Sequence, residues 1–360
     1  MRDSGTRRGR GSGFNTPNRF EKTHLEPLDI DLEYEDGEPQ LQTTFYPDSS
    51  KSILAKNDSP DLPFDYSINP YRGCEHGCIY CYARPSHEYL GFSAGLDFES
   101  KIMVKLNAAR LLEEIFRKKS WQPQMVAFSG NTDCYQPVER KLQLTRQCLE
   151  VFLKFRNPVG MVTKNALVLR DIDILQEMAK LHLIHIMISI TSLDAELIRK
   201  MEPRTSTPAN RLKAIEELAK NGIPVGVNAA PMIPGLTDEE LPSILKAAKE
   251  HGATSAGYIL LRLPGAVKPL FLDWLKRELP NRAGKILNRI KDTREGELSS
   301  SCFGKRMKGE GEIAEAITNL FDIHVRKYNL HKRWSGLSTE HFRTNAGPES
   351  PRQQLELFSR

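Results

Sequence analysis

Short runs of apolar and β-branched residues recur six times from residue 65 onward, and longer stretches with helical apolar spacing lie between them. The apolar runs cover residues 65–69, 124–129, 159–163, 184–190, 223–230 and 254–261. The helical stretches are Lys105–Lys119, Arg140–Phe155, Asp171–Leu181, Pro208–Asn221 and Asp238–His251. Strands that alternate with amphipathic helices are typical of a parallel sheet covered by helices.

We therefore predict an α/β fold, and specifically a partial (βα)6 barrel of the TIM type. No G-x-G-x-x-G segment follows the first apolar run, which disfavours a dinucleotide-binding doubly wound sheet. In a barrel of this kind the chemistry lies at the carboxyl ends of the strands. A cysteine-rich loop follows the first predicted strand, where this rule expects a functional site.

The segments outside the six units differ in composition. Residues 1–60 begin with a stretch rich in Arg, Gly and Ser and continue with an acidic patch, so we predict that they form a disordered tail. The predicted barrel covers residues 61–265. Residues 266–330 contain three further helical stretches and form a predicted C-terminal helical extension. Residues 331–360 are polar and are predicted to be a second disordered tail.

Composition narrows the class of protein only slightly. The chain has 360 residues with a net charge of +5, which by itself is too weak to indicate a nucleic-acid partner. No apolar run approaches the ~18 residues of a membrane span, and the N-terminus has no apolar segment of a secretory signal. Three of the six cysteines are clustered, which favours metal chemistry in a reducing, cytoplasmic compartment over disulfides.

The cysteine loop is the strongest chemical signal. In "RGCEHGCIYCY" (residues 72–82), Cys74, Cys78 and Cys81 have the spacing C-x3-C-x2-C. Three thiolates can hold three irons of a [4Fe–4S] cluster and leave the fourth iron open to the amino and carboxylate groups of S-adenosylmethionine. The alternative is a zinc site with His76, His87 or Cys134 as the fourth ligand, although no second C-x2-C pair is present.

The loop resembles the C-x3-C-x-aromatic-C signature of the radical SAM superfamily, with Tyr80 in the aromatic position beside the adenine. Over residues 65–265 the chain is most similar to the spore photoproduct lyase-like branch, through "CIYCY" and "VTKNALVLRDIDIL". The segments "NPYRGCEHGCIYCYARPSHEYLGFSAGLDFE" and "GNTDCYQPVE" resemble a bacterial subgroup labelled DNA repair photolyase-like. The resemblance implies reductive cleavage of S-adenosylmethionine to a 5′-deoxyadenosyl radical, with an external reductant of flavodoxin or ferredoxin type.

The resemblance also implies a set of residues that bind S-adenosylmethionine. The superfamily often places Gly-Gly-Glu at the end of the second strand, against the methionine amino group; here the segment is Gly130, Asn131, Thr132 and Asp133. The alternative is an ordinary strand-to-helix loop. The carboxylate is expected at Lys164 or, instead, Arg204, although Lys164 would equally suit an exposed strand end. Further polar contacts are expected from Ser189 and Asn228.

The hydrogen donor differs from that of spore photoproduct lyase. That family uses a cysteine at the end of strand two, and Gly130 occupies the corresponding position here, so we do not expect a straightforward spore photoproduct lyase. The candidate donors are Cys134 and Tyr82; the alternative for Cys134 is a small buried loop residue.

Three hypotheses for function remain. The first is a radical SAM enzyme that acts on a nucleic acid or nucleotide. The second is radical SAM modification of a peptide or small metabolite, and the third is a non-catalytic, metal-stabilised binding module. The terminal segment Gln354–Phe358, "QLELF", resembles the peptide by which bacterial repair proteins bind the sliding clamp, and this favours the first hypothesis. The loop within residues 301–317 is either a phosphate-binding loop at a helix N-terminus or a flexible helix cap.

Overall fold

The computed structural model describes residues 9–20, 41–332 and 336–344. Its larger sheet has eight strands in the order β11-β10-β9-β8-β7-β6-β3-β2. Six neighbouring strands are parallel and confirm the six predicted runs: β3 (Tyr66–Ile68), β6 (Val126–Phe128), β7 (Val159–Thr163), β8 (Ile184–Ser189), β9 (Val225–Met232) and β10 (Ser255–Leu260).

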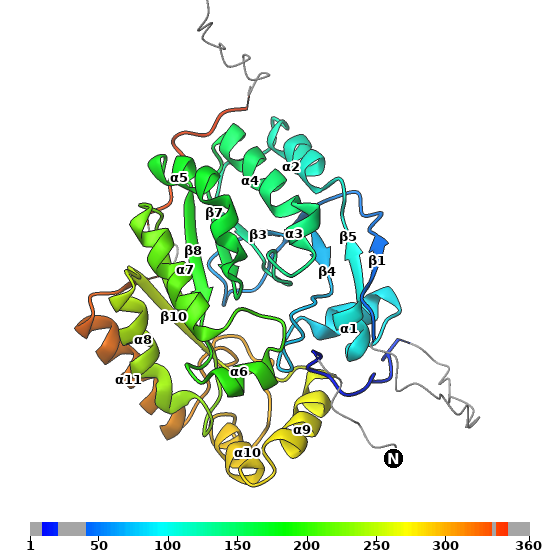
Figure 1. Cartoon of the computed structure of the whole chain (residues 1–360), viewed down its shortest axis with the longest axis vertical. Coiled ribbons are helices and arrows are strands. Elements are labelled where there is room, and N and C mark those ends of the chain that lie inside the picture. Colours follow the sequence, from blue (N-terminus) through cyan, green and yellow to red (C-terminus); the bar gives the residue numbers. More distant parts are fainter. Residues whose placement is uncertain (1–8, 21–40, 333–335, 345–360) are drawn as a thin grey trace, which may run out of the picture.

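The larger sheet does not close on itself. Its edges are β2 (Leu54–Lys56), which runs antiparallel to β3, and the short β11 (His331–Lys332) beside β10. An open, mostly parallel sheet with helices between the strands is a partial barrel, so the predicted fold class is confirmed (Figure 1). All six residues of β8 are buried, as expected for a strand covered on both faces.

Most of the helices between the strands form one layer along the outer face of this sheet, but α6 lies away from this layer, at the lower end of the molecule in the view of Figure 1. Their bounds are α2 (Ala108–Phe116), α3 (Glu139–Leu142), α4 (Leu144–Phe155), α5 (Ile172–Lys180), α6 (Ala195–Met201), α7 (Pro208–Lys220) and α8 (Leu241–Glu250). The main core between this layer and the sheet includes Phe152 and Ile186, both fully buried. The predicted stretch Arg140–Phe155 is split into α3 and α4 because Gln143 has a left-handed conformation with φ of 52°.

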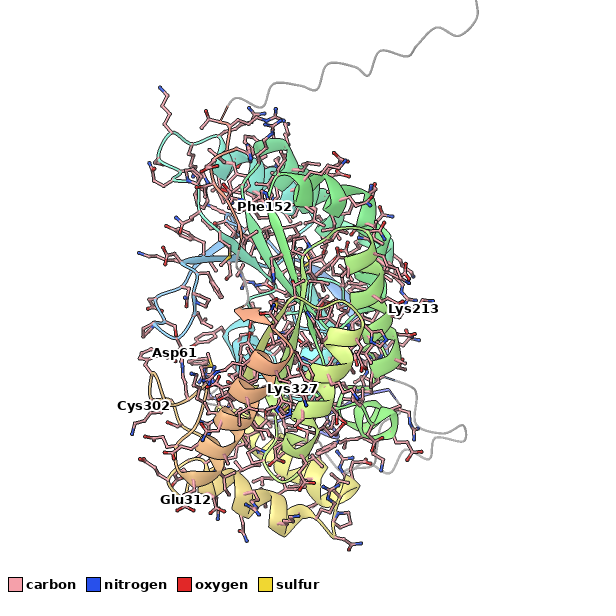
Figure 2. All side chains as sticks on the ribbon, turned by 90° about the vertical axis from the view of Figure 1, so that its left-hand side faces the viewer. Asp61, Phe152, Lys213, Cys302, Glu312 and Lys327 are labelled. Carbon is pink, nitrogen blue, oxygen red and sulfur yellow. The ribbon has the colours of Figure 1, made fainter. Side chains whose placement is uncertain are left out.

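The predicted C-terminal helices are present as α9 (Val267–Glu278), α10 (Ala283–Asp292) and α11 (Glu312–Lys327). The helices α9 and α10 build a second core in which Phe271 and Trp274 pack with Tyr80 and Ile79 of the cysteine loop. The helix α11 lies against α8 and extends the outer layer (Figure 2). The extension therefore supports the cysteine loop from one side.

Much of the predicted N-terminal tail is part of the fold, so that prediction is wrong for residues 9–20 and 41–60. The strand β1 (Thr44–Pro47) belongs to a second, three-stranded sheet with β4 (Tyr71–Arg72) and β5 (Lys101–Val104), which follows α1 (Leu96–Ser100). Residues 9–20 run along the cysteine loop and α1. Composition could not reveal this packing because the partners of these polar residues lie some 80 positions later.

Part of the predicted C-terminal tail also packs on the body. Within residues 336–344, the Ser338 amide donates to the His182 carbonyl at 3.0 Å, and the Arg343 amide donates to the Phe155 carbonyl at 3.0 Å. The prediction of disorder is wrong for this segment as well. The clamp-like segment Gln354–Phe358 lies outside the described residues.

Candidate functional site

Three cysteines from one loop line a single cavity at the carboxyl ends of the strands. Cys74 and Cys78 are buried, and Cys81 is partly buried beside Cys74. The loop is held by short-range turns and by the Cys74 amide, which donates to the Phe98 carbonyl at 2.9 Å. Burial raises the pKa of all three thiols, so without a metal to stabilise the thiolates they are neutral at ordinary pH.

A buried ion pair holds the back of this loop. The guanidinium of Arg84 lies 2.5 Å from the carboxylate of Glu99, and both side chains are fully buried. Arg84 also donates to the backbone carbonyls of Cys78 and Gly77, at 3.0 and 3.2 Å. A charged donor that spans two loop carbonyls fixes the position of the cysteine-bearing backbone. Sequence analysis missed this pair because the two residues are polar and lie outside the cysteine motif.

Residues 9–20, which we call the N-terminal strap, complete this support. The amides of Gly11 and Ser12 donate to the two carboxylate oxygens of Glu99, at 3.0 and 2.8 Å. Arg10 donates to the Glu99 carbonyl at 2.5 Å. The strap also pairs with α1, where the side chain of Asn15 accepts from the Asp97 amide at 3.0 Å. Glu99 therefore connects the strap to Arg84 and, through it, to the cysteine loop.

The strap approaches the loop so closely that only glycine fits at position 11. A Cβ atom on Gly11 would lie 1.8 Å from the Gly77 carbonyl oxygen. Gly77 itself has a φ of 67°, and a Cβ there would lie 2.8 Å from a carboxylate oxygen of Glu99. Two backbones that touch in this way require glycine on both sides.

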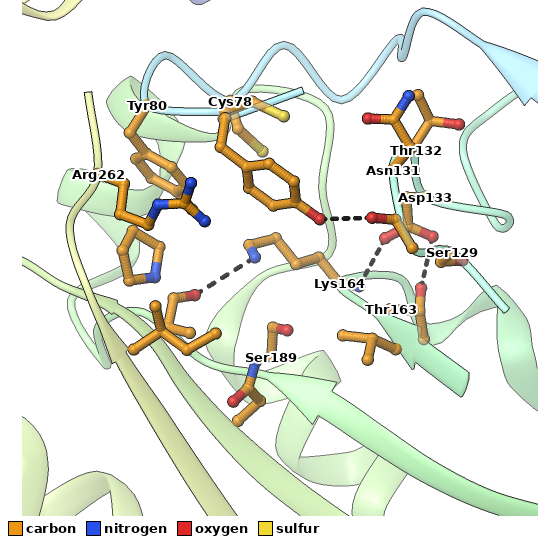
Figure 3. A pocket seen from close by; sticks show the side chains of 18 of the residues that line it. Cys78, Tyr80, Ser129, Asn131, Thr132, Asp133, Thr163, Lys164, Ser189 and Arg262 are labelled. Atoms are coloured by element: carbon orange, nitrogen blue, oxygen red, sulfur yellow. Dashed lines mark hydrogen bonds between the residues drawn. The ribbon is translucent and has the colours of Figure 1, made fainter. Parts of the chain in front are cut away.

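The cavity has a volume of about 260 Å³ and is lined by residues from all six parallel strands or the segments that follow them. Its described lining includes the three cysteines and His76 from the loop, and Lys164, Ser189 and Asn228 from the strand ends. Figure 3 shows Lys164 extending across the floor of the cavity between Tyr80 and Asp133. The fold thus brings together residues as far apart in the chain as Leu62 and Met307.

Asn228 and Ser189 face each other on adjacent strands. They are register partners of β9 and β8, and both are buried and line the cavity. The side-chain oxygen of Asn228 is buried and has no hydrogen-bond partner among the residues that the structure describes. An orphaned acceptor of this kind is costly unless a bound molecule supplies a donor. Asn228 is therefore the residue that most directly indicates a polar ligand in the cavity.

Lys164 provides the positive charge of the cavity wall. Its ammonium group lies 3.4 Å from the Ala230 carbonyl and 5.9 Å from the ring centre of Tyr80. The carbonyl contact is long, so the ammonium retains donors for an anionic ligand. Lys164 lines the cavity, and its role at a carboxylate stays a prediction.

The segment after β6, which was predicted to bind S-adenosylmethionine, makes many of its hydrogen bonds within the protein. Asp133 accepts from Thr163 at 2.8 Å, from the Lys164 amide at 2.8 Å and from the Tyr135 amide at 2.9 Å, so its oxygens are already occupied by the protein. Thr132 donates to the Tyr71 carbonyl at 2.8 Å. Both residues line the cavity, but their hydrogen bonds hold the loop. Asn131, which contacts Ser86 at 3.3 Å, keeps more capacity for a ligand.

Gly130 is glycine for a reason internal to the fold. A Cβ at this position would lie 2.8 Å from the Cβ of Ser67 on the neighbouring strand β3. Its carbonyl accepts from the Tyr82 hydroxyl at 2.7 Å. Gly130 lines the cavity, yet close strand packing already explains why no side chain is present.

Tyr80 belongs to a buried polar network. Its hydroxyl contacts Glu202 and lies 3.2 Å from the Thr191 hydroxyl, and Glu202 is paired with the fully buried Arg211. Although burial opposes ionisation, Arg211 and Lys164 lower the pKa of Glu202 to about 2. The network fixes the ring of Tyr80 on one wall of the cavity.

Two predicted site residues lie away from the cavity. Arg204 donates to the Gly9 carbonyl at 3.0 Å and approaches Glu75 at 3.6 Å, so it anchors the strap. Cys134 is fully buried in the main core and is not among the residues that line the cavity. Burial raises the pKa of the Cys134 thiol well above its usual range. The alternative interpretation of Cys134, a small buried residue, agrees better with this location.

Of the two candidate hydrogen donors, only Tyr82 reaches the cavity. It lines the cavity, its ring is about half exposed, and its hydroxyl donates to the Gly130 carbonyl. Sequence analysis missed most of the remaining wall beside Tyr82, although it singled out the loop that carries Arg306 and Met307. This wall is formed by Leu62 and Phe64, which precede β3, and by Arg262, Arg306 and Met307, which follow β10.

The radical SAM superfamily model matches residues 68–248, half of the chain, and the protein belongs to this superfamily. An uncharacterized protein of Mycobacterium tuberculosis is 37% identical over 240 residues, which cover 66% of this chain and 71% of that protein. An uncharacterized protein of Methanocaldococcus jannaschii is 31% identical over 175 residues, or 49% of this chain and 63% of that protein. Spore photoproduct lyase, solved in complex with dinucleoside spore photoproduct, has a TM-score of 0.59 with 17% identity and covers 82% of this chain and 85% of that one. The structural likeness shows a shared fold.

Superfamily membership identifies the chain as an enzyme of the radical SAM class, whose members use a [4Fe–4S] cluster, S-adenosylmethionine and an external reductant. The non-catalytic hypothesis is thereby disfavoured. The residues of the cavity fit these cofactors: three thiols face it together with a lysine and an orphaned amide oxygen. Within the described ranges, no group of three His, Cys, Asp or Glu side chains is arranged around a single metal ion. A cubane cluster needs its thiolates at separate corners and does not require such convergence.

No helix in the described part of the chain has the length and apolar character needed to span a membrane.

Proposed function

We propose that this enzyme holds a [4Fe–4S] cluster on Cys74, Cys78 and Cys81, cleaves S-adenosylmethionine beside it, and acts on a nucleic acid or nucleotide in the outer part of the same cavity. When bound and reduced, the cluster supplies the electron that breaks S-adenosylmethionine into methionine and a 5′-deoxyadenosyl radical. The observation that carries the proposal is the single cavity lined at once by the three thiols, by Lys164 and Asn228, and by Tyr82 and two arginines.

The strand-end residues orient S-adenosylmethionine in this proposal. Lys164 pairs with its carboxylate, since the ammonium group keeps donors that the Ala230 carbonyl does not occupy. The orphaned oxygen of Asn228 accepts from an amino or hydroxyl group, and the Ser189 hydroxyl lies across the strand pair from it. The second core behind Tyr80 excludes water from this side of the site.

Tyr82 serves the substrate radical in this proposal. The 5′-deoxyadenosyl radical would take a hydrogen atom from a C–H bond of the substrate and leave as 5′-deoxyadenosine. The substrate radical would later take a hydrogen atom from the Tyr82 hydroxyl, and the tyrosyl radical would recover an electron from the external reductant and a proton from solvent. The half-exposed ring at the cavity supports this role, and the burial of Cys134 in the main core favours Tyr82 over Cys134 as the donor.

A nucleic-acid substrate is supported by the chemistry of the outer wall. Phe64 and Tyr82 offer rings for a base to stack on, and Arg262 and Arg306 offer positive charge for a phosphate. Spore photoproduct lyase, which shares the fold, was solved with a dinucleoside photoproduct. This second support is an analogy between folds. The sliding-clamp contact of Gln354–Phe358 remains a prediction outside the described residues.

The test is anaerobic reconstitution followed by dithionite reduction. Wild-type protein is expected to bind about four irons and to form 5′-deoxyadenosine from S-adenosylmethionine, with the yield raised by UV-irradiated DNA. Cys78→Ala is expected to lose both properties. Cys302→Ala, which changes an exposed cysteine, is the matched control and is expected to keep them. A wild-type protein that binds one zinc and forms no 5′-deoxyadenosine refutes the proposal.

A further inference from the structure

Three arginines gather beside the cavity at the point where β10 ends: Arg294 is buried, and Arg262 and Arg306 are partly buried. Arg262 follows β10, and Arg306 belongs to the loop of residues 302–309, whose Met307 carbonyl accepts from the Leu260 amide at 2.9 Å. Arg294 lies behind them and donates to the carbonyls of Leu261 and Lys305, at 2.8 and 3.0 Å. We call Arg262, Arg294 and Arg306 the arginine cluster.

The arginine cluster has few negative partners. Arg306 pairs with Asp61 at 2.5 Å, and the Gly304 amide donates to the same carboxylate at 2.7 Å (Figure 2 shows Asp61 beside this loop). Glu310, whose carboxylate interacts electrostatically with Arg294, is itself paired with Lys305 at 2.5 Å. Within the described part of the chain, the hydrogen bonds of the Arg294 side chain go to carbonyl oxygens. One carboxylate is therefore shared among three guanidinium groups.

Arg262 is the member of the cluster whose charge is least satisfied. Among the described residues its contacts are the Met307 sulfur at 3.7 Å and the ring of Tyr82, whose centre lies 5.8 Å away. Its Nε is buried and has no hydrogen-bond partner in residues 9–20, 41–332 or 336–344, and the same holds for the Nε of Arg294. Burial and the neighbouring Arg306 lower the pKa of Arg262, and burial and Arg262 lower the pKa of Arg294 to about 10. Buried, mutually repelling cations destabilise a fold unless an anion binds between them.

The geometry points to a phosphate site. We propose that Arg262 binds a phosphate group of the substrate inside the cavity, with Arg294 and Arg306 supplying the surrounding positive charge. Figure 3 shows Arg262 projecting into the cavity beside Tyr80, on the side opposite Ser129 and Asp133. A guanidinium group with free donors matches the oxygens of a phosphate. This inference rests on the proposed function and specifies how the nucleic-acid substrate is held.

The structure also changes the interpretation of the loop within residues 301–317. The predicted phosphate site at a helix N-terminus would lie at Gly311, before α11. Lys305 is engaged by Glu295 and Glu310 instead, and Arg306 and Met307 turn toward the cavity. The loop therefore contributes to the arginine cluster through Arg306.

The first experiment measures binding of a fluorescein-labelled, UV-irradiated DNA duplex to reconstituted holoenzyme at several salt concentrations. Arg262→Gln is expected to weaken binding about tenfold and to reduce the salt slope by about one, the signature of one lost phosphate contact. The matched control is Arg110→Gln, which removes an exposed arginine of α2 that is paired with Glu114. The control is expected to change the affinity less than twofold.

The second experiment measures the thermal midpoint with and without pyrophosphate. Without ligand, Arg262→Gln is expected to unfold at the same or a higher temperature than wild type because the variant relieves repulsion. Pyrophosphate is expected to raise the midpoint of wild type more than that of the variant. A lower midpoint of the variant, with equal stabilisation by pyrophosphate, would assign Arg262 a purely structural role and overturn the proposal.

Further outcomes also overturn the inference. Equal losses of duplex affinity in Arg262→Gln and Arg110→Gln would show that overall positive charge, and no specific contact of Arg262, attracts the DNA. If wild type binds neither the duplex nor pyrophosphate, the proposed phosphate site does not exist. If Arg262→Gln lost affinity for S-adenosylmethionine but kept its affinity for the duplex, the anion bound by Arg262 would be the carboxylate of the cofactor. The proposed function is judged separately, by 5′-deoxyadenosine formation in wild type. Wild type that forms it while Arg262→Gln binds duplex normally refutes this inference alone.

Discussion

Replacement of Gly11 by Ala tests whether the N-terminal strap holds the cysteine loop. The new methyl group would lie 1.8 Å from the Gly77 carbonyl oxygen, whereas ordinary contact begins at 3.4 Å. The backbones must therefore separate by about 1.6 Å. Such a movement breaks the hydrogen bonds from Gly11 and Ser12 to Glu99, which are 3.0 and 2.8 Å long. The strap should therefore leave the loop.

The cost follows from these two bonds. A hydrogen bond to a charged group contributes about 1.5–3 kcal/mol, so losing both weakens docking of the strap by at least ~3 kcal/mol. A factor of ten corresponds to about 1.4 kcal/mol, so the detached population rises roughly a hundredfold. Because Glu99 also pairs with Arg84, the cysteine loop loses support at the same time.

Two assays check this prediction. Limited trypsin digestion should cleave after Arg10 roughly a hundred times faster in Gly11→Ala than in wild type, when opening is fast relative to cleavage. In reconstituted protein, air should bleach the absorbance of the cluster faster. Gly284→Ala adds the same methyl group in α10, where no atom lies within 4 Å, and should behave as wild type. Unchanged cleavage and bleaching in Gly11→Ala would refute the role assigned to the strap.

Three further predictions concern the cavity. Asn228→Ala should weaken binding of S-adenosylmethionine by about tenfold, measured by calorimetry, because the substitution removes the acceptor oxygen that would hydrogen-bond the cofactor. An unchanged affinity would show that Asn228 does not contact the cofactor. Tyr82→Phe should abolish product formation while 5′-deoxyadenosine is still formed, whereas Cys134→Ala, in the core, should lower stability and leave the ratio of product to 5′-deoxyadenosine unchanged; the reverse pattern would restore Cys134 as donor. Glu202, whose pKa falls from 4.5 to about 2 on folding, contributes up to about 3 kcal/mol of stability that is present above pH 4.5 and is lost as the pH falls toward 2. The stability difference between wild type and Glu202→Gln, from urea unfolding, should therefore shrink below pH 4.5, and a constant difference would contradict this assignment.

The local patterns of the sequence were sufficient for the barrel and for the cysteine loop. Each parallel strand is a run of buried residues, and each outer helix has an apolar face, so the period of the pattern reports the element directly. The three cysteines lie within eight residues, and their spacing alone places them in one loop. Lys164, Ser189 and Asn228 follow from the rule that strand carboxyl ends meet at one edge.

Only the tertiary structure decided which polar residues share the site. Cys134 and Arg204 occupy suggestive positions in the sequence, but one side chain points into the core and the other pairs with the strap. The strap and the arginine cluster depend on contacts between segments that are about 80 and 245 positions apart, Gly11 with Glu99 and Asp61 with Arg306. Local periodicity carries no information about such pairs, because burial and charge compensation are set by whatever the folded chain places opposite each residue.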